Sequence, residues 1–172
     1  MTSDHSMAVT LGADGGMASQ YLTFVLGGEV FAMDIRRVRE IIQHAAMTVV
    51  PLMPGFVRGV INLRGAVVPV IDLQSRLGGA ATQVGKKTCI VIFDASGESE
   101  RLELGLMVDA VSEVIEIPSA HMEPAPQFGT PIARDFILGM GKIKGEFIVI
   151  LDPERALNID DMVALAAHAS EV

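Results

Sequence analysis

The sequence predicts a mostly β protein that is built from two similar small units. Short apolar runs separated by turn residues recur along the chain, which is typical of strands joined by tight loops. The segment "RGVINLRGAVVPVIDL" (58–73) also has a counterpart, "LGMGKIKGEFIVILDP" (138–153). Each of these segments places a cation and a glycine between two apolar runs, which indicates the same β-hairpin made twice.

In the first half, order is expected to begin near Gln20. The runs 21–26 and 30–35 flank a glycine pair and predict a hairpin. The next segment, "RRVREIIQ" (36–43), fits either a helical turn or a strand, because its apolar spacing suits both. Two prolines then mark a loop before the hairpin of 58–73.

The second half repeats this order. Strands are predicted on both sides of the polar loop "DASGESE" (94–100), followed by a Pro-rich stretch and the second hairpin. Identical residues recur 73 positions later in the pairs Val38 and Val111, Glu40 and Glu113, and Ile42 and Ile115. Others recur 80 positions later, namely Phe56 and Phe136, Gly59 and Gly139, Gly65 and Gly145, and Asp72 and Asp152.

The apolar runs of the first hairpin predict how the units pack. Apolar and polar residues do not alternate within "VRGVINL" or "AVVPVIDL", so both faces of this sheet are expected to be buried. Burial on both sides in a small unit implies that the two units pack on each other. Pro69 has no backbone N–H and is expected at an edge or irregularity of the sheet. Residues 1–19 predict a flexible tail, and "NIDDMVALAAHA" (158–169) predicts a helix.

Composition excludes several classes of function. The chain of 172 residues carries 21 acidic and 13 basic side chains, a net charge of −8, which disfavours binding to nucleic acid or anionic lipid. No secretory signal pattern is present, and no apolar run approaches the roughly 20 residues that span a bilayer. A cytoplasmic protein without direct membrane insertion is expected.

The residue pattern gives no indication of catalysis. None of the four histidines has a metal-ligand spacing, and the single cysteine, Cys89, lies in an apolar run as expected for a small buried residue. Nucleophile-elbow and phosphate-loop motifs are missing, and "LGMGKIKG" leads into a strand rather than a helix. We therefore predict a protein that is not an enzyme, holds no cofactor or metal, and works by binding other proteins.

The segments "FAMDIRRVREII", "GVINLRGAVVPVIDL", "LGLMVDAVSEVIEI" and "ILGMGKIKGEFIVILD" together resemble the CheW family of bacterial chemotaxis coupling proteins. The resemblance implies two intertwined five-stranded SH3-like β-barrels over residues 20–157, with short helices. The first half would cover about 20–80 and the second about 86–155, with strands partly exchanged, and 158–172 would form a C-terminal helix and tail.

The resemblance also implies a function and its partners. The chain would be an adaptor between the cytoplasmic tips of methyl-accepting chemoreceptors and the regulatory domain of the histidine kinase CheA, recruited to membrane-associated receptor arrays. Kinase contacts would lie at the outer ends of both barrels. The implied receptor-binding residues are Val38, Glu40, Asn62, Arg64 and Gly65.

Single residues at this surface have simpler interpretations. Arg64 could be an ordinary solvated turn cation, and Glu40 an ordinary exposed acid. The family resemblance instead favours a receptor role for Arg64, with a Glu40–Arg64 ion pair shaping the surface. Ile41 is predicted to belong to the core, while Val38 fits either the core or a receptor contact. Lys144 and Glu113 occupy the matching positions in the second half, but lysine lacks the planar fork of arginine, so the first half is expected to carry more of the receptor specificity.

Two alternative functions stay open. The first is a related adaptor of a non-flagellar chemosensory pathway, for example in twitching motility. The second is a small-ligand-binding β-barrel, which would need a pocket with convergent polar groups.

Overall fold

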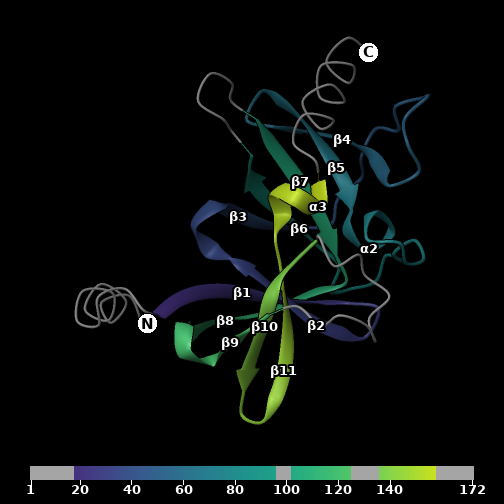
Figure 1. Cartoon of the computed structure of the whole chain (residues 1–172). Helices are drawn as coiled ribbons and strands as arrows, with labels where there is room; N and C mark the ends of the chain where they lie inside the picture. The colour runs from purple at the N-terminus through teal and green to yellow at the C-terminus, as the bar shows by residue number, and fades with distance from the viewer. Residues whose placement is uncertain (1–17, 96–101, 125–135, 158–172) are drawn as a thin grey trace.

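The computed structural model of the chain describes residues 18–95, 102–124 and 136–157. The tail predicted for 1–19 lies outside these residues, except that Ala18 and Ser19 begin the first strand. The helix predicted after residue 157 also lies outside them. Within the described residues the fold is mostly β, with two sheets and a few short helices (Figure 1).

The strands and helices follow the predicted order in both halves. The first half contains β1 (Ala18–Leu26), β2 (Glu29–Asp34), η1 (Ile35–Arg37), β3 (Val38–Gln43), β4 (Val57–Leu63), β5 (Ala66–Asp72) and α2 (Leu73–Arg76). The second contains β6 (Cys89–Asp94), β7 (Glu103–Val108), β8 (Ala110–Pro118), η2 (Ser119–His121), β9 (Met122–Glu123), β10 (Ile137–Ile143), β11 (Glu146–Leu151) and α3 (Pro153–Leu157). Segment 36–43 combines both of its predicted forms, a 3-10 turn and then a strand.

Each sheet contains strands from both halves of the chain. The five-stranded sheet has the order β3-β6-β7-β5-β4, and the six-stranded sheet has the order β8-β1-β2-β11-β10-β9. Strands β1 to β5 of the first half correspond to β6, β7, β8, β10 and β11 of the second half. When every strand of the five-stranded sheet is replaced by its counterpart in the other half, the result is the order of the six-stranded sheet without β9. The two halves therefore exchange their first hairpins, which confirms the predicted intertwined architecture.

Three apolar cores explain why so many strand residues are hydrophobic. One small core lies against strands of the five-stranded sheet and includes Ile90 and Ile92. A second lies against the six-stranded sheet and includes Tyr21 and Ile117. The large central core lies between the two sheets. It contains residues that alternate, along the strands, with those of the two small cores. In β6, Ile90 and Ile92 face a small core while Val91 and Phe93 face the central core, so no position of that run is left for a polar residue.

Pro69, expected at an edge or an irregularity of the sheet, lies in an interior strand at a place where the pairing is incomplete. Strand β5 lies between β7 and β4, and Pro69 is opposite Val60 in the β4–β5 pairing. Val60 exchanges both of its backbone hydrogen bonds with Thr48 on its other side, at 2.8 and 3.0 Å. Pairing of β5 with β7 begins only at Val70. An interior strand thus tolerates proline because neither neighbour needs its missing N–H.

Asp34 begins the turn between β2 and β3. Its carboxylate accepts a hydrogen bond from the backbone N–H of Arg36 at 2.9 Å and binds the Arg36 guanidinium through both oxygens. Partial burial raises the pKa of Asp34, but the hydrogen bonds and charge of Arg36 outweigh it, so the pKa lies below its ordinary value. The ionised form therefore stabilises this turn.

We predict that Gly105→Ala destabilises the fold. A Cβ at Gly105 would meet Ile90 Cγ2 at 2.7 Å and Val70 Cγ2 at 3.3 Å inside the small core. Such overpacking costs about 1–3 kcal/mol, which urea unfolding would measure. Gly85→Ala is the matched control, because its Cβ would meet nothing within 4 Å. Equal stability of the two variants would contradict the packing described here.

We predict a pH-dependent loss of stability in Asp34→Asn. Because the folded-state pKa of Asp34 is lowered, its contribution is present above the unfolded pKa of about 3.9 and is lost as pH falls through the folded value. At pH 7 the variant should be less stable by under about 1 kcal/mol, since the pair is partly exposed. Thermal unfolding from pH 7 to pH 2.5 should show the two proteins converging. A constant difference would contradict this assignment.

Candidate protein-binding surface

The turn between β4 and β5 holds Arg64 in an uncommon conformation. Leu63 pairs with Ala66, so Arg64 and Gly65 form a two-residue loop with φ values of 53° and 86°. Positive φ at both positions is the requirement of a type I′ hairpin turn. The Asn62 side-chain oxygen accepts a hydrogen bond from the Gly65 N–H at 3.1 Å and fixes the loop. Arg64 is thereby presented at the tip of the hairpin.

Arg64 forms an ion pair with Glu40, as the family resemblance implies. The guanidinium Nη2 lies 2.6 Å from the Glu40 carboxylate, with the Arg64 side chain 64% exposed. This hydrogen bond raises the pKa of Arg64. The pair connects the β4–β5 turn to β3, the strand at the other side of the five-stranded sheet. It therefore fixes one arrangement of charges on an exposed surface.

Strand β3 carries two apolar residues of interest, Val38 and Ile41, on its opposite faces. Val38 is half-buried and packs against the central core. The prediction that Ile41 belongs to the core is wrong, because Ile41 is 41% exposed. Exposure alternates along β3, so Arg39, Ile41 and Gln43 all face outward. Of the five predicted receptor-binding residues, the structure brings Glu40 to Arg64 and Asn62 to Gly65, while Val38 lies beside the core.

The second hairpin repeats the backbone of this turn and not its ion pair. Lys144 and Gly145 have φ values of 51° and 83°, close to those of Arg64 and Gly65. Among the ion pairs of the described residues, none joins Lys144 to Glu113. The two hairpin tips therefore share a shape and differ in charge arrangement.

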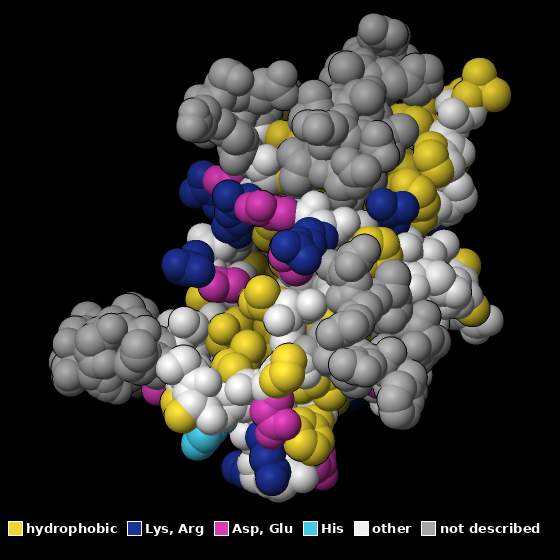
Figure 2. All heavy atoms as spheres, in the orientation of Figure 1, with side chains coloured by type: hydrophobic (Ala, Val, Ile, Leu, Met, Phe, Trp, Pro, Cys, Tyr) yellow, Lys and Arg dark blue, Asp and Glu magenta, His cyan; other side chains and the backbone are white. Residues whose placement is uncertain are grey.

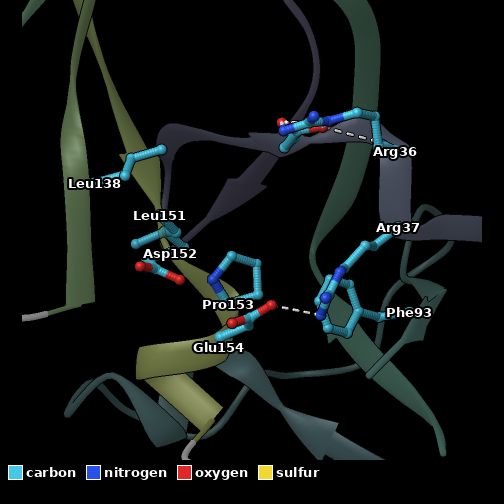
Figure 3. A pocket seen from close by; sticks show the side chains of 9 residues that line it. Arg36, Arg37, Phe93, Leu138, Leu151, Asp152, Pro153 and Glu154 are labelled. Atoms are coloured by element: carbon cyan, nitrogen blue, oxygen red, sulfur yellow. Dashed lines mark hydrogen bonds and ion pairs between the residues drawn. The ribbon is translucent and has the colours of Figure 1, made fainter. Parts of the chain in front are cut away.

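A pocket of about 470 Å³ lies close to β3 and was not predicted from the sequence. One wall carries Arg36 and Arg37 of η1, and the opposite wall carries Pro153 and Glu154 of α3 (Figure 3). An ion pair between Arg37 and Glu154 crosses from one wall to the other. These elements are more than 100 positions apart, so only the fold brings them together.

The face around this pocket is charged with both signs. Figure 2 shows basic and acidic side chains intermingled between β3 and α3, next to a group of hydrophobic side chains. Three arginines of this face each form an ion pair: Arg36 with Asp34, Arg37 with Glu154, and Arg39 with Asp94. The basic groups are thus held by acids from three different elements. A surface of this kind, with oriented charges beside exposed apolar residues, suits recognition of another protein.

In the ranges 18–95, 102–124 and 136–157, no group of three or more His, Cys, Asp or Glu side chains could hold a metal ion. No helix within the same ranges is long and apolar enough to cross a membrane.

Comparisons with known proteins agree on one family. The CheW-like domain profile matches residues 20–161. The chemotaxis protein CheW of Klebsiella aerogenes is 30% identical over 146 residues, covering 85% of this chain and 86% of its own. The chemotaxis protein CheW of Rhizobium meliloti is 32% identical over 133 residues, covering 77% and 83%.

A solved structure supports the same assignment. The crystal structure of the scaffolding protein TtCheW from Thermoanaerobacter tengcongensis superposes with a TM-score of 0.71 and 36% sequence identity, covering 79% of this chain and 90% of that one. Sequence profile, relatives and fold therefore coincide over the two intertwined sheets. The chain belongs to the CheW family of chemotaxis scaffold proteins.

Proposed function

We propose that this chain is a non-catalytic adaptor that couples transmembrane chemoreceptors to the histidine kinase CheA, so that receptor state controls kinase activity. The observation that carries the proposal is the match of the CheW-like domain to residues 20–161, on a fold that repeats the same β unit twice. The unit formed by 20–157 would bind both partners. The chain would act in the cytoplasm at membrane-associated receptor arrays.

The receptor tip would bind at β3 and the β4–β5 turn. The Glu40–Arg64 pair supplies oriented charges, and Asn62 and Gly65 hold the turn that presents them. Val38 lies on the same face of β3 as Glu40, at the edge of the central core, and Ile41 adds an exposed apolar residue on the outward face of that strand. Apolar contact gives most of the affinity at such interfaces, while paired charges select the partner and its orientation.

The kinase regulatory domain would bind the outer ends of the two sheet units. The second unit presents an exposed apolar residue in its hairpin, Phe147 of β11, away from the β4–β5 turn. A partner built from the same repeated unit could meet these ends by similar packing. Receptor and kinase would then bind different faces and be held together at the same time.

A related adaptor with an output other than flagellar chemotaxis is a second candidate. It is favoured by the similarity to the protein FrzA of Myxococcus xanthus, which is 27% identical over 135 residues and carries a different name from the other relatives. Identification of the receptors and kinase recovered with the tagged chain from its own cells would distinguish the two pathways.

Reconstitution tests the main proposal. Receptor-containing membranes, the kinase and this chain would be mixed, and kinase autophosphorylation measured with and without attractant. We expect receptor-dependent activation that requires the chain and sediments with the membranes. Kinase activity that is the same with and without the chain would contradict the proposal.

We predict that Arg64→Ala leaves the fold intact and weakens receptor coupling. The side chain is mostly exposed, so the unfolding midpoint should move by no more than about 2 °C. Loss of the oriented cation should lower receptor binding in co-sedimentation by about tenfold, as for a residue central to an interface. Lys144→Ala, at the equivalent turn, is the control and should bind as the unchanged chain does. Equal effects of both changes would contradict the assignment to the first hairpin.

We predict that Ile41→Ser also weakens receptor binding, by roughly fivefold to tenfold. The side chain is 41% exposed, so folding should change little. Val114→Ser is the matched control, because Val114 lies 73 positions later, on β8, and is 47% exposed. Binding of both variants to receptor membranes would be compared at equal protein concentration. If Ile41→Ser binds normally, Ile41 is not part of the contact.

A further inference from the structure

The short helices α2 and α3 meet at a junction of the two halves. Each follows an equivalent strand, and the same backbone contact precedes each one. Asp72 N–H donates to the Phe56 carbonyl at 2.7 Å, and Asp152 N–H donates to the Phe136 carbonyl at 2.9 Å. The junction therefore relates two equivalent corners of the fold, each with a phenylalanine beside the start of a helix.

Arg76 is the side chain that occupies this junction. Its guanidinium carbon lies 5.0 Å from the centre of the Phe56 ring and 5.8 Å from that of Phe136. Its Nε–H also donates to the Ala156 carbonyl of α3 at 2.7 Å. Cation–π contacts with two rings and a charged hydrogen bond are directional, unlike apolar packing.

Only one of the two equivalent helix positions, 76 and 156, carries an arginine. The position equivalent to Arg76 is Ala156, 80 residues later, and Ala156 is fully buried. One of the two related positions thus carries a long side chain, and the other carries a small one that leaves room for it. Arg76, which follows β5 of the five-stranded sheet, contacts α3, which follows β11 of the six-stranded sheet.

Helix α3 depends on such tertiary contacts. It spans only five residues, from Pro153 to Leu157, and a helix this short is unstable by itself. Ala156 and Leu157 anchor one side in the central core. Its other end forms a wall of the pocket, where Glu154 pairs with Arg37 beside β3. A change in the docking of α3 would therefore alter the pocket and the charges next to β3.

We propose that Arg76 is a latch that holds α3 in place and thereby fixes the pocket wall opposite η1. Arg76 is a positioning residue in this role, because it acts on Arg37 through α3 and Glu154. Without the guanidinium contacts the docking of α3 is weaker and the helix opens more often, while both sheets stay folded because Arg76 takes no part in their strand pairing. The proposal concerns the isolated chain and does not depend on the proposed receptor and kinase partners.

Amide hydrogen exchange of the full chain tests the latch. The amide of Ala156, which donates to the Asp152 carbonyl at 2.9 Å, reports opening of α3. In Arg76→Met, which keeps an apolar side chain between the rings, this amide should exchange about tenfold faster. Amides of β6 and β7 should change by less than about twofold. The Arg37 Nε resonance should also shift, because the link from Arg76 to Arg37 runs through α3.

Arg39→Met is the matched control. Arg39 is likewise an arginine held by a specific contact, but that contact is an ion pair with Asp94 of the five-stranded sheet and does not involve α3. It should leave Ala156 exchange and the Arg37 resonance unchanged. Arg76→Lys should lie between the unchanged chain and Arg76→Met, because lysine keeps a cation near the rings without the planar guanidinium. The proposal is overturned if Ala156 exchange is unaffected in Arg76→Met, or if all strands accelerate as much as α3.

Discussion

The exchange of hairpins between the two halves is the constraint on which the rest of the structure depends. The central core takes residues from β1 and β2 of one sheet and from β6 and β7 of the other, so it forms only when both hairpins have crossed. Neither half of the chain can complete a sheet by itself. The apolar sequence of β6 follows from this, because Val91 and Ile92 face two different cores. Burial of this kind is the main driving force of folding.

A core buried so deeply between the sheets leaves the outer positions free for binding. Alternation along β3 directs Ile41 outward, and the tight turn of Arg64 and Gly65 projects a cation without help from the core. The ion pair with Glu40 then orients that cation. Because these groups contribute little to folding, their identity can follow the needs of a partner. Lys144 occupies the same backbone position in the second half with a different charge arrangement, as expected when two equivalent turns serve different contacts.

The Glu40–Arg64 pair was implied by the family resemblance. Sequence reasoning predicted the repeat and the hairpins, because both are encoded in local patterns or in matching positions such as Gly65 and Gly145. It was wrong for Ile41, since "REII" alone does not say which face of a strand is covered. For Pro69 it left an edge and an irregularity open, because the pairing of Val60 with Thr48 cannot be seen in the hairpin itself. The contacts of Arg37 and Arg76 with α3 were not predicted, because they join residues about 80 to 120 positions apart.

The central claim is that one double β unit holds two protein partners on separate faces. Sedimentation velocity with a soluble receptor signalling fragment, the kinase regulatory domain and this chain tests it most directly. We expect a complex that contains all three proteins, with each partner retained when the other is in excess. Mutually exclusive binding, in which excess receptor fragment displaces the kinase domain from the chain, would contradict it.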